Sequence, residues 1–96
     1  MSDETICMHI LVKGRVQGVG FRDAAYQTSK KMGDLKGWVR NLDNGDVEIL
    51  VQSTRAKVEE FEQWCHKGPP SARIDVVLAN QVKVEPGLMT FSIRKF

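Results

Sequence analysis

Apolar residues recur at every second position in the first segment of the chain. They are Ile6, Met8, Ile10 and Val12, and the positions between them hold Cys7, His9 and Leu11. A period of two places these two sets on opposite faces of a β-strand. We therefore predict a strand over residues 6–12 with at least one buried face.

The apolar period lengthens to that of a helix from residue 21 onward. The predicted apolar stripe consists of Phe21, Ala24, Ala25, Thr28 and Met32. This spacing is typical of an amphipathic helix. Lys30 and Lys31 would lie in its last turn, where positive charge is favoured, and Gly33 is the residue expected to end it.

A β-hairpin is predicted next. The segments 37–41 and 47–52 carry β-branched and aromatic residues, and Asn44-Gly45 lies between them. An Asn-Gly pair tolerates the positive φ that a tight hairpin turn requires. The first of the two strands would therefore end at Asn41.

A second helix is expected after the hairpin. Ser53 and Thr54 are candidates for its N-cap, because their hydroxyls can accept a hydrogen bond from the first turn. Its apolar residues are Val58, Phe61, Trp64 and Cys65. The run Gly68-Pro69-Pro70 cannot continue a helix and would end it.

The remaining chain predicts further strands. Within residues 73–84 we expect Ile74, Val76 and Leu78 to share one face, and Pro86-Gly87 to form a turn. Alternation in the last segment involves Met89, Phe91 and Ile93. The order is βαββαβ, and the pattern also allows a short fifth strand near the C-terminus. We predict an α+β, ferredoxin-like fold, with an antiparallel or mixed sheet and both helices on one face.

Length and composition indicate one domain over residues 1–96. The chain is 42% hydrophobic and 27% charged, which is ordinary for a globular protein. No apolar stretch approaches the about 20 residues of a membrane span. The N-terminus lacks the features of a signal peptide. We expect a cytoplasmic protein with no membrane partner.

Charge and cysteine content restrict the partners. A formal net charge of +2 is too small to indicate a nucleic acid, and it fits a small anion. The two cysteines, Cys7 and Cys65, do not form a metal-binding set with the two histidines, so no metal site is predicted. Whether the cysteines are free or bridged stays open; we interpret both as buried small hydrophobic residues.

The segment from Gly14 to Arg22, GRVQGVGFR, joins the first strand to the first helix. Glycines allow successive backbone N–H groups to converge on one point. A helix N-terminus adds unsatisfied N–H groups and partial positive charge. The guanidinium of Arg22 can bind two phosphate oxygens together. The segment therefore predicts a phosphate site, with a Gly-rich turn and a surface arginine as the alternative.

The spacing of this loop excludes several known phosphate sites. It matches neither the Walker A loop nor the dinucleotide-binding fingerprint. No Ser, Thr or Cys lies between Gly14 and Arg22, so a covalent phosphoenzyme at the loop is not expected. Water would then be the nucleophile. Asn41 could hold that water, because an amide both donates and accepts hydrogen bonds; alternatively, Asn41 only forms the turn.

Two stretches of the sequence resemble the signatures of the acylphosphatase family. The first is Gly14 to Arg22, and the second is Gly37 to Asn41 continued by Gly45 and Val47. Family-like features also occur at residues 68–74 and 91–94, so the resemblance covers nearly the whole chain. It implies hydrolysis of acyl phosphates without a metal or cofactor.

The resemblance also implies residue roles. Arg22 would bind the substrate phosphate, and Asn41 would orient the catalytic water. The backbone amides of the phosphate cradle would be those of Arg15, Val16, Gln17, Gly18, Val19, Gly20 and Phe21. Two positions depart from the family pattern. Ser53 replaces a usual glycine, and Lys95-Phe96 follows Arg94 where the family commonly ends in tyrosine.

The expected partners are an acyl phosphate substrate and inorganic phosphate, as product and inhibitor, and the chain is expected to act as a monomer.

Three alternatives to acyl phosphate hydrolysis stay open. A non-hydrolytic acyl-phosphate or carbamoyl-phosphate binding module would keep the loop, and a regulatory small-ligand domain would share only the fold. An RNA-binding domain with this fold would present aromatic residues on its central strands, and residues 6–12 and 47–52 contain none.

Overall fold

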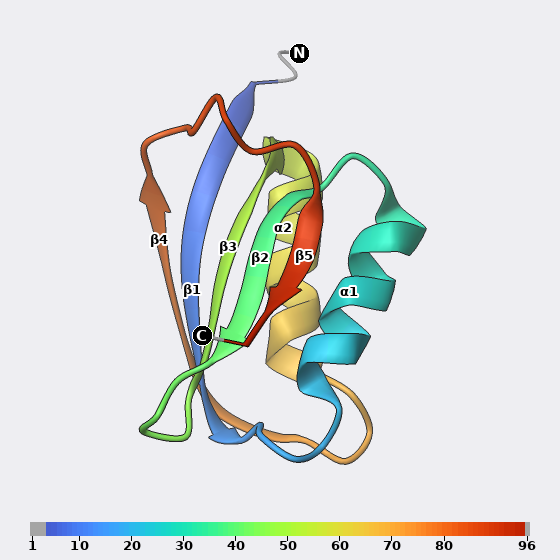
Figure 1. Cartoon of the computed structure of the whole chain (residues 1–96), viewed down its shortest axis with the longest axis vertical. Coiled ribbons are helices and arrows are strands. Elements are labelled where there is room, and N and C mark those ends of the chain that lie inside the picture. The colour runs from blue at the N-terminus through green and yellow to red at the C-terminus, as the bar shows by residue number, and fades with distance from the viewer. Residues whose placement is uncertain (1–3, 96) are drawn as a thin grey trace.

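The computed structural model describes residues 4–95, which form a mixed β-sheet and two helices (Figure 1). The strands are β1 (Thr5–Arg15), β2 (Lys36–Asn41), β3 (Val47–Thr54), β4 (Arg73–Val82) and β5 (Phe91–Arg94). The helices are α1 (Phe21–Met32) and α2 (Arg55–Lys67). The predicted βαββαβ order is confirmed, and so is the short fifth strand.

The sheet has the strand order β4-β1-β3-β2-β5. Its pairs are antiparallel except β2 with β5, which run parallel. Both helices lie against one face of the sheet, as predicted (Figure 1). The β1–α1 connection and the β2–β3 turn therefore lie at the same end of the molecule, at the bottom of Figure 1.

The hydrophobic core lies between the sheet and the helices. Each strand of the sheet interior contributes alternate residues, and each helix contributes one stripe. Core residues include Ile6, Ile10, Val12, Phe21, Ala25, Val39, Ile49, Val51, Val58, Phe61 and Cys65. This burial supplies the main stabilisation of the fold, and it holds the N-terminus of α1 against the end of the sheet.

Strand β4 corrects one prediction. Val76 and Leu78 are 43% and 45% exposed, whereas Ile74 and Val77 pack against the core. The pairing with β1 shifts between Lys13 and Gly14, so that β4 has an extra residue there. Such a bulge reverses the alternation of faces along a strand. Ile74, Val76 and Leu78 therefore do not share a face.

Other local predictions also changed. Ser53 lies within β3, and Thr54 is the N-cap of α2 but its hydroxyl makes no capping hydrogen bond. On α1, Ser29 is buried and Thr28 is not, because Ser29 follows the buried Ala25 by four positions on the same helix face. The Ser29 hydroxyl donates to the carbonyl of Tyr26 at 2.6 Å. Met89 precedes β5 and is 79% exposed.

Cys7 and Cys65 are both free and buried. Burial raises the pKa of each thiol, since the charged thiolate is disfavoured away from water. Both residues are therefore small apolar packing residues, as the sequence suggested.

Glu48 links three strands on the sheet face opposite the helices. His9 Nε2 lies 2.7 Å from its Oε2, and Arg40 Nε donates to its Oε1 at 2.6 Å. Burial alone would raise the pKa of Glu48, but the hydrogen bonds and charges of His9 and Arg40 outweigh it, so the pKa is lowered.

We expect Glu48→Gln to reduce the free energy of unfolding by about 1 kcal/mol at pH 7. A lowered folded-state pKa gives stability that is present above the unfolded-state pKa and lost as the pH falls through the folded-state value. The difference from wild type should therefore shrink below about pH 4. Urea unfolding at pH 7 and pH 3 measures it, with exposed Glu60→Gln as the control; a difference that is independent of pH would contradict it.

Candidate active site

The loop between β1 and α1 consists of residues 16–20. Gly18 and Gly20 have φ values of 72° and 78°, in the left-handed region that side chains disfavour. Gly20 is the N-cap of α1, and its carbonyl accepts the first helical hydrogen bond, from Ala24 N at 2.9 Å. The glycines therefore turn the chain from strand to helix within five residues and leave the first N–H groups of α1 at the end of the sheet.

A cavity of about 460 Å³ opens at this helix N-terminus. It brings together Arg22, from the first turn of α1, and Asn41, the last residue of β2. The full lining is Val16, Gly18, Gly20, Phe21, Arg22, Asp23, Asn41, Ile93 and Lys95. Two residues that are 19 positions apart in the sequence thus share one cavity.

Asn41 has an unusual environment. Its backbone pairs with Val47 at the start of the hairpin turn. Its Oδ1 is buried and accepts no hydrogen bond from any residue in the described range 4–95. A buried polar oxygen without a partner costs about 1–3 kcal/mol, and such costs are typical of functional sites.

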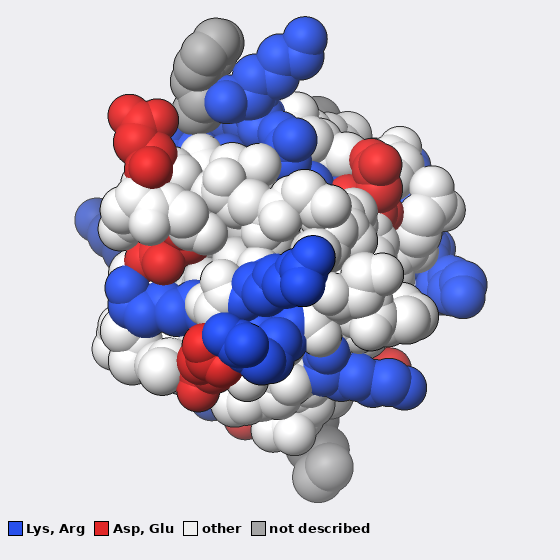
Figure 2. Space-filling view, turned by 90° about the horizontal axis from the view of Figure 1, so that it is seen from below, with Lys and Arg blue, Asp and Glu red and all other residues white. Residues whose placement is uncertain are grey.

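The electrostatics of the cavity favour an anion. Arg22 and Lys95 contribute two cationic side chains to the lining, and Asp23 contributes one carboxylate. The N-terminus of α1 adds partial positive charge at the same place. Figure 2 shows this end of the molecule, where Lys and Arg side chains stand out at the centre and along the rim.

The structure places the predicted loop residues unequally. Val16, Gly18, Gly20 and Phe21 line the cavity, whereas Arg15, Gln17 and Val19 are not part of its lining. The side chain of Gln17 turns instead to the β2–β3 turn, where its Nε2 donates to the carbonyls of Leu42 and Asp46.

Three lining residues were not predicted: Asp23, Ile93 and Lys95. Asp23 could have been predicted from the sequence, because it directly follows Arg22 in the first turn of the predicted helix. Lys95 follows β5, and it reaches the cavity because β5 pairs in parallel with β2 and ends beside Asn41. The sequence did not predict this pairing. Phe96, the other residue of the unusual ending, lies outside the described residues.

The lining restricts the chemistry that the cavity can perform. It contains no Ser, Thr, Cys or His side chain. Within residues 4–95, no group of three or more His, Cys, Asp or Glu residues is placed to hold a metal ion. The lining does offer the first residues of a helix, two cations and an asparagine, and these groups suit the binding of a phosphoryl group together with a water.

A second hollow, of about 610 Å³, lies between α1 and α2. It is lined by Trp64, Pro69 and Pro70 together with Lys31 and Lys67, among others. It is larger than the first cavity but contains neither Arg22 nor Asn41. Size alone therefore does not identify the site, and the converging polar groups favour the first cavity.

No helix in the described part of the chain is long and apolar enough to cross a membrane.

Known proteins are similar to this chain in both sequence and fold. The acylphosphatase family model matches residues 8–93. An acylphosphatase of Anaeromyxobacter dehalogenans (strain 2CP-C) is 48% identical over 85 residues, which are 88% of this chain and 90% of that protein. A solved structure of an acylphosphatase from Coxiella burnetii has a TM-score of 0.87 at 34% identity, covering 94% of this chain and 93% of that one.

A larger protein also contains a similar unit. The crystal structure of HypF from T. kodakarensis has a TM-score of 0.80 at 32% identity, covering 95% of this chain but only 12% of that chain. The relatives of comparable length carry the name acylphosphatase, and the family model spans the two segments that hold Arg22 and Asn41. This chain therefore belongs to the acylphosphatase family.

Proposed function

We propose that this protein hydrolyses acyl phosphates to a carboxylate and inorganic phosphate. One observation carries the proposal: Arg22 and Asn41, whose buried Oδ1 has no hydrogen-bond partner among the described residues, line the same cavity at the N-terminus of α1. Membership of the acylphosphatase family supports it. The substrate class follows from the family and from a site with groups for a phosphoryl anion and a water.

The phosphoryl group would bind at the curled loop. The backbone N–H groups of residues 15–21 and the guanidinium of Arg22 would share its oxygens, and the α1 N-terminus would add a favourable potential. These donors also stabilise the charge on the equatorial oxygens in the transition state. Of these donors, Arg22 is the one that carries a full positive charge.

Asn41 would hold the attacking water. Its Oδ1 accepts a hydrogen bond from the water, which fixes one lone pair of the water oxygen toward phosphorus. That oxygen forms the new P–O bond while the bond between phosphorus and the acyl oxygen breaks. The acyl oxygen leaves with the bonding electron pair as a carboxylate, whose pKa of about 4–5 makes protonation unnecessary.

The proton of the water has two candidate acceptors. The first is a phosphoryl oxygen of the substrate itself, which yields dihydrogen phosphate; this product can then release a proton to solvent. The second is the carboxylate of Asp23, which lines the cavity but is exposed. We favour the phosphoryl oxygen, because it belongs to the reacting group itself, whereas the negative charge of the Asp23 carboxylate would repel the dianion.

We also infer that residues 1–96 act as one domain and as a monomer in the cytoplasm, without a cofactor, nucleic acid or membrane partner. Arg22 and Asn41 line one cavity within a single chain, so these two residues can meet without a second copy. Inorganic phosphate would bind as product and competitive inhibitor.

A non-hydrolytic binding module is the second candidate. The likeness to a 12% segment of a HypF chain favours it, since that segment is part of a much larger protein. Both candidates bind phosphate at the loop, and only the first turns over an acyl phosphate.

Hydrolysis of benzoyl phosphate by chelator-treated protein separates the two. We expect turnover that is unaffected by the chelator and competitively inhibited by inorganic phosphate. In parallel, titration with phosphate should shift the amide resonances of residues 14–22. Shifts without turnover would favour the binding module, and neither shifts nor turnover would refute phosphate binding at the loop.

A further inference from the structure

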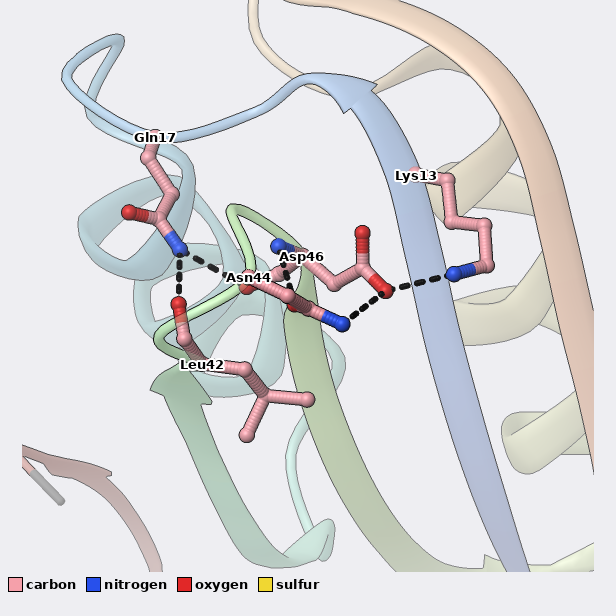
Figure 3. A network of polar contacts seen from close by, with 5 residues as sticks. All are labelled: Lys13, Gln17, Leu42, Asn44 and Asp46. Atoms are coloured by element: carbon pink, nitrogen blue, oxygen red, sulfur yellow. Dashed lines mark hydrogen bonds and ion pairs between the residues drawn. The ribbon is translucent and has the colours of Figure 1, made fainter.

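The side chain of Gln17 joins two parts of the site that are distant in sequence. Its Nε2 donates to the carbonyl of Leu42 at 2.7 Å and to the carbonyl of Asp46 at 2.9 Å. Figure 3 shows the side chain reaching from the β1–α1 loop to the β2–β3 turn. A primary amide has two N–H hydrogens, so one is available for each carbonyl.

The two acceptor carbonyls lie at the two ends of the turn. Leu42 N donates to Asp46 O at 2.9 Å, and Gly45 N donates to Leu42 O at 3.2 Å, so these bonds close the turn on itself. Gln17 therefore contacts the turn where its geometry is already constrained. Leu42 directly follows Asn41, and Gly18 directly follows Gln17. The bridge thus connects the phosphate loop to the strand end that carries the water-holding side chain.

A second link supports the same placement. Lys13, near the end of β1, donates to the Asp46 carboxylate at 2.6 Å. Asn44 orients that carboxylate, because its Nδ2 donates to Asp46 Oδ2 at 3.3 Å and its Oδ1 accepts from Asp46 N at 3.0 Å (Figure 3). Asp46 is only 8% exposed. Lys13 precedes the loop, however, so it does not hold residues 16–20 themselves.

Within the described range, no backbone hydrogen bond joins residues 16–20 to residues 42–46. The Gln17 amide is therefore the polar contact that sets the separation of the loop from the turn. An error of about 1 Å between reacting groups can reduce a rate by about 100-fold. A phosphate held by the loop and a water held by Asn41 must meet within such a tolerance.

We propose that Gln17 is a positioning residue that sets the distance between bound phosphate and the water on Asn41. This inference rests on the proposed hydrolysis. It gives the side chain of Gln17 a role apart from its backbone N–H, which every substitution except proline retains. Loss of the bridge should slow the chemical step more than it weakens phosphate binding.

The test is Gln17→Met, which keeps the length of the side chain and removes both donors. We expect kcat for benzoyl phosphate to fall by about 10–100-fold, while the Ki of inorganic phosphate changes by less than about threefold. Gln17→Ala should behave alike and provides a second variant if one fails to fold. One control should keep the wild-type kcat: Gln81→Met, at an exposed glutamine on β4.

A double-mutant cycle separates positioning from a general structural effect. If Gln17 acts through Asn41, then Gln17→Met should cost less than about threefold in an Asn41→Ala background, since the water is no longer held. An equal loss of kcat in both backgrounds would overturn the proposal. So would a wild-type kcat in folded Gln17→Met, or a Ki that rises by the factor by which kcat falls. Wild-type protein that fails to hydrolyse benzoyl phosphate would overturn the proposed function, and this inference with it.

Discussion

Replacement of Arg22 by Ala or Gln is expected to nearly abolish turnover of benzoyl phosphate. A cation placed on a transferring phosphoryl group contributes about 10³-fold or more to the rate. Because Arg22 would contact the phosphate both before and during reaction, kcat/KM should fall by at least about 10³-fold and the Ki of inorganic phosphate should rise as well. Steady-state kinetics with phosphate as competitive inhibitor measure both effects.

Arg73→Gln is the matched control for this prediction. Arg73 is an exposed arginine at the start of β4, and it is not part of the cavity lining. Its loss should leave kcat/KM within about twofold of wild type. If Arg22→Gln kept wild-type turnover, or if Arg73→Gln lost as much, binding of the phosphoryl group by Arg22 would be refuted. Lys95 also lines the cavity, but a flexible ammonium cannot replace a bidentate guanidinium.

Asn41→Ala is expected to separate binding from chemistry. The variant lacks the amide that holds the water but retains the loop and Arg22. The Ki of phosphate should therefore stay near the wild-type value, while kcat falls by about 10²–10³-fold, as for one preorganised contact. Stability should not fall by much, since Oδ1 of Asn41 accepts no hydrogen bond within the described residues. Competitive inhibition and thermal unfolding of one preparation test both statements.

Asp23→Asn accompanies this experiment as a test of the proton acceptor. If the substrate phosphate takes the proton of the water, the variant should retain most of the wild-type kcat, and loss of the carboxylate should slightly favour phosphate binding. A fall in kcat comparable to that of Asn41→Ala would instead identify Asp23 as the base. Wild-type kcat in Asn41→Ala would remove the water-holding role altogether.

Local sequence patterns predicted the elements that position the site. Periods of two and of about three and a half residues placed β1 and α1 on either side of the glycine-rich loop. The Asn44-Gly45 pair predicted a turn after Asn41; in the structure residues 42–46 form this turn, and Gly45 has the positive φ, of 97°. Arg22 and Asn41 were both found in this way, because each occupies a defined place at the end of an element.

Face assignments along β4 could not be predicted in the same way. The alternation of Ile74, Val76 and Leu78 was regular, yet the bulge opposite Gly14 reversed it. A bulge depends on the partner strand, and the alternation within β4 contains no information about that partner. Lys95 was missed for a related reason, because only the parallel pairing of β5 with β2 brings the chain end to the cavity.

The amino-acid sequence by itself determined the order of strands and helices, the glycine-rich loop between β1 and α1, and the positions of Arg22 and Asn41, the two residues proposed to act in hydrolysis. These features follow from the short-range apolar period and from turn chemistry. Tertiary structure alone decided that Gln17 bridges to Leu42 and Asp46, that Asn41 lines the cavity while its Oδ1 has no partner among the described residues, and that Lys95 joins the lining. The two hydrogen bonds of Gln17 join residues that are 25 and 29 positions apart in the sequence. Such contacts form only after the strands have paired into the sheet. Their geometry therefore depends on the pairing of whole strands rather than on any local stretch of sequence.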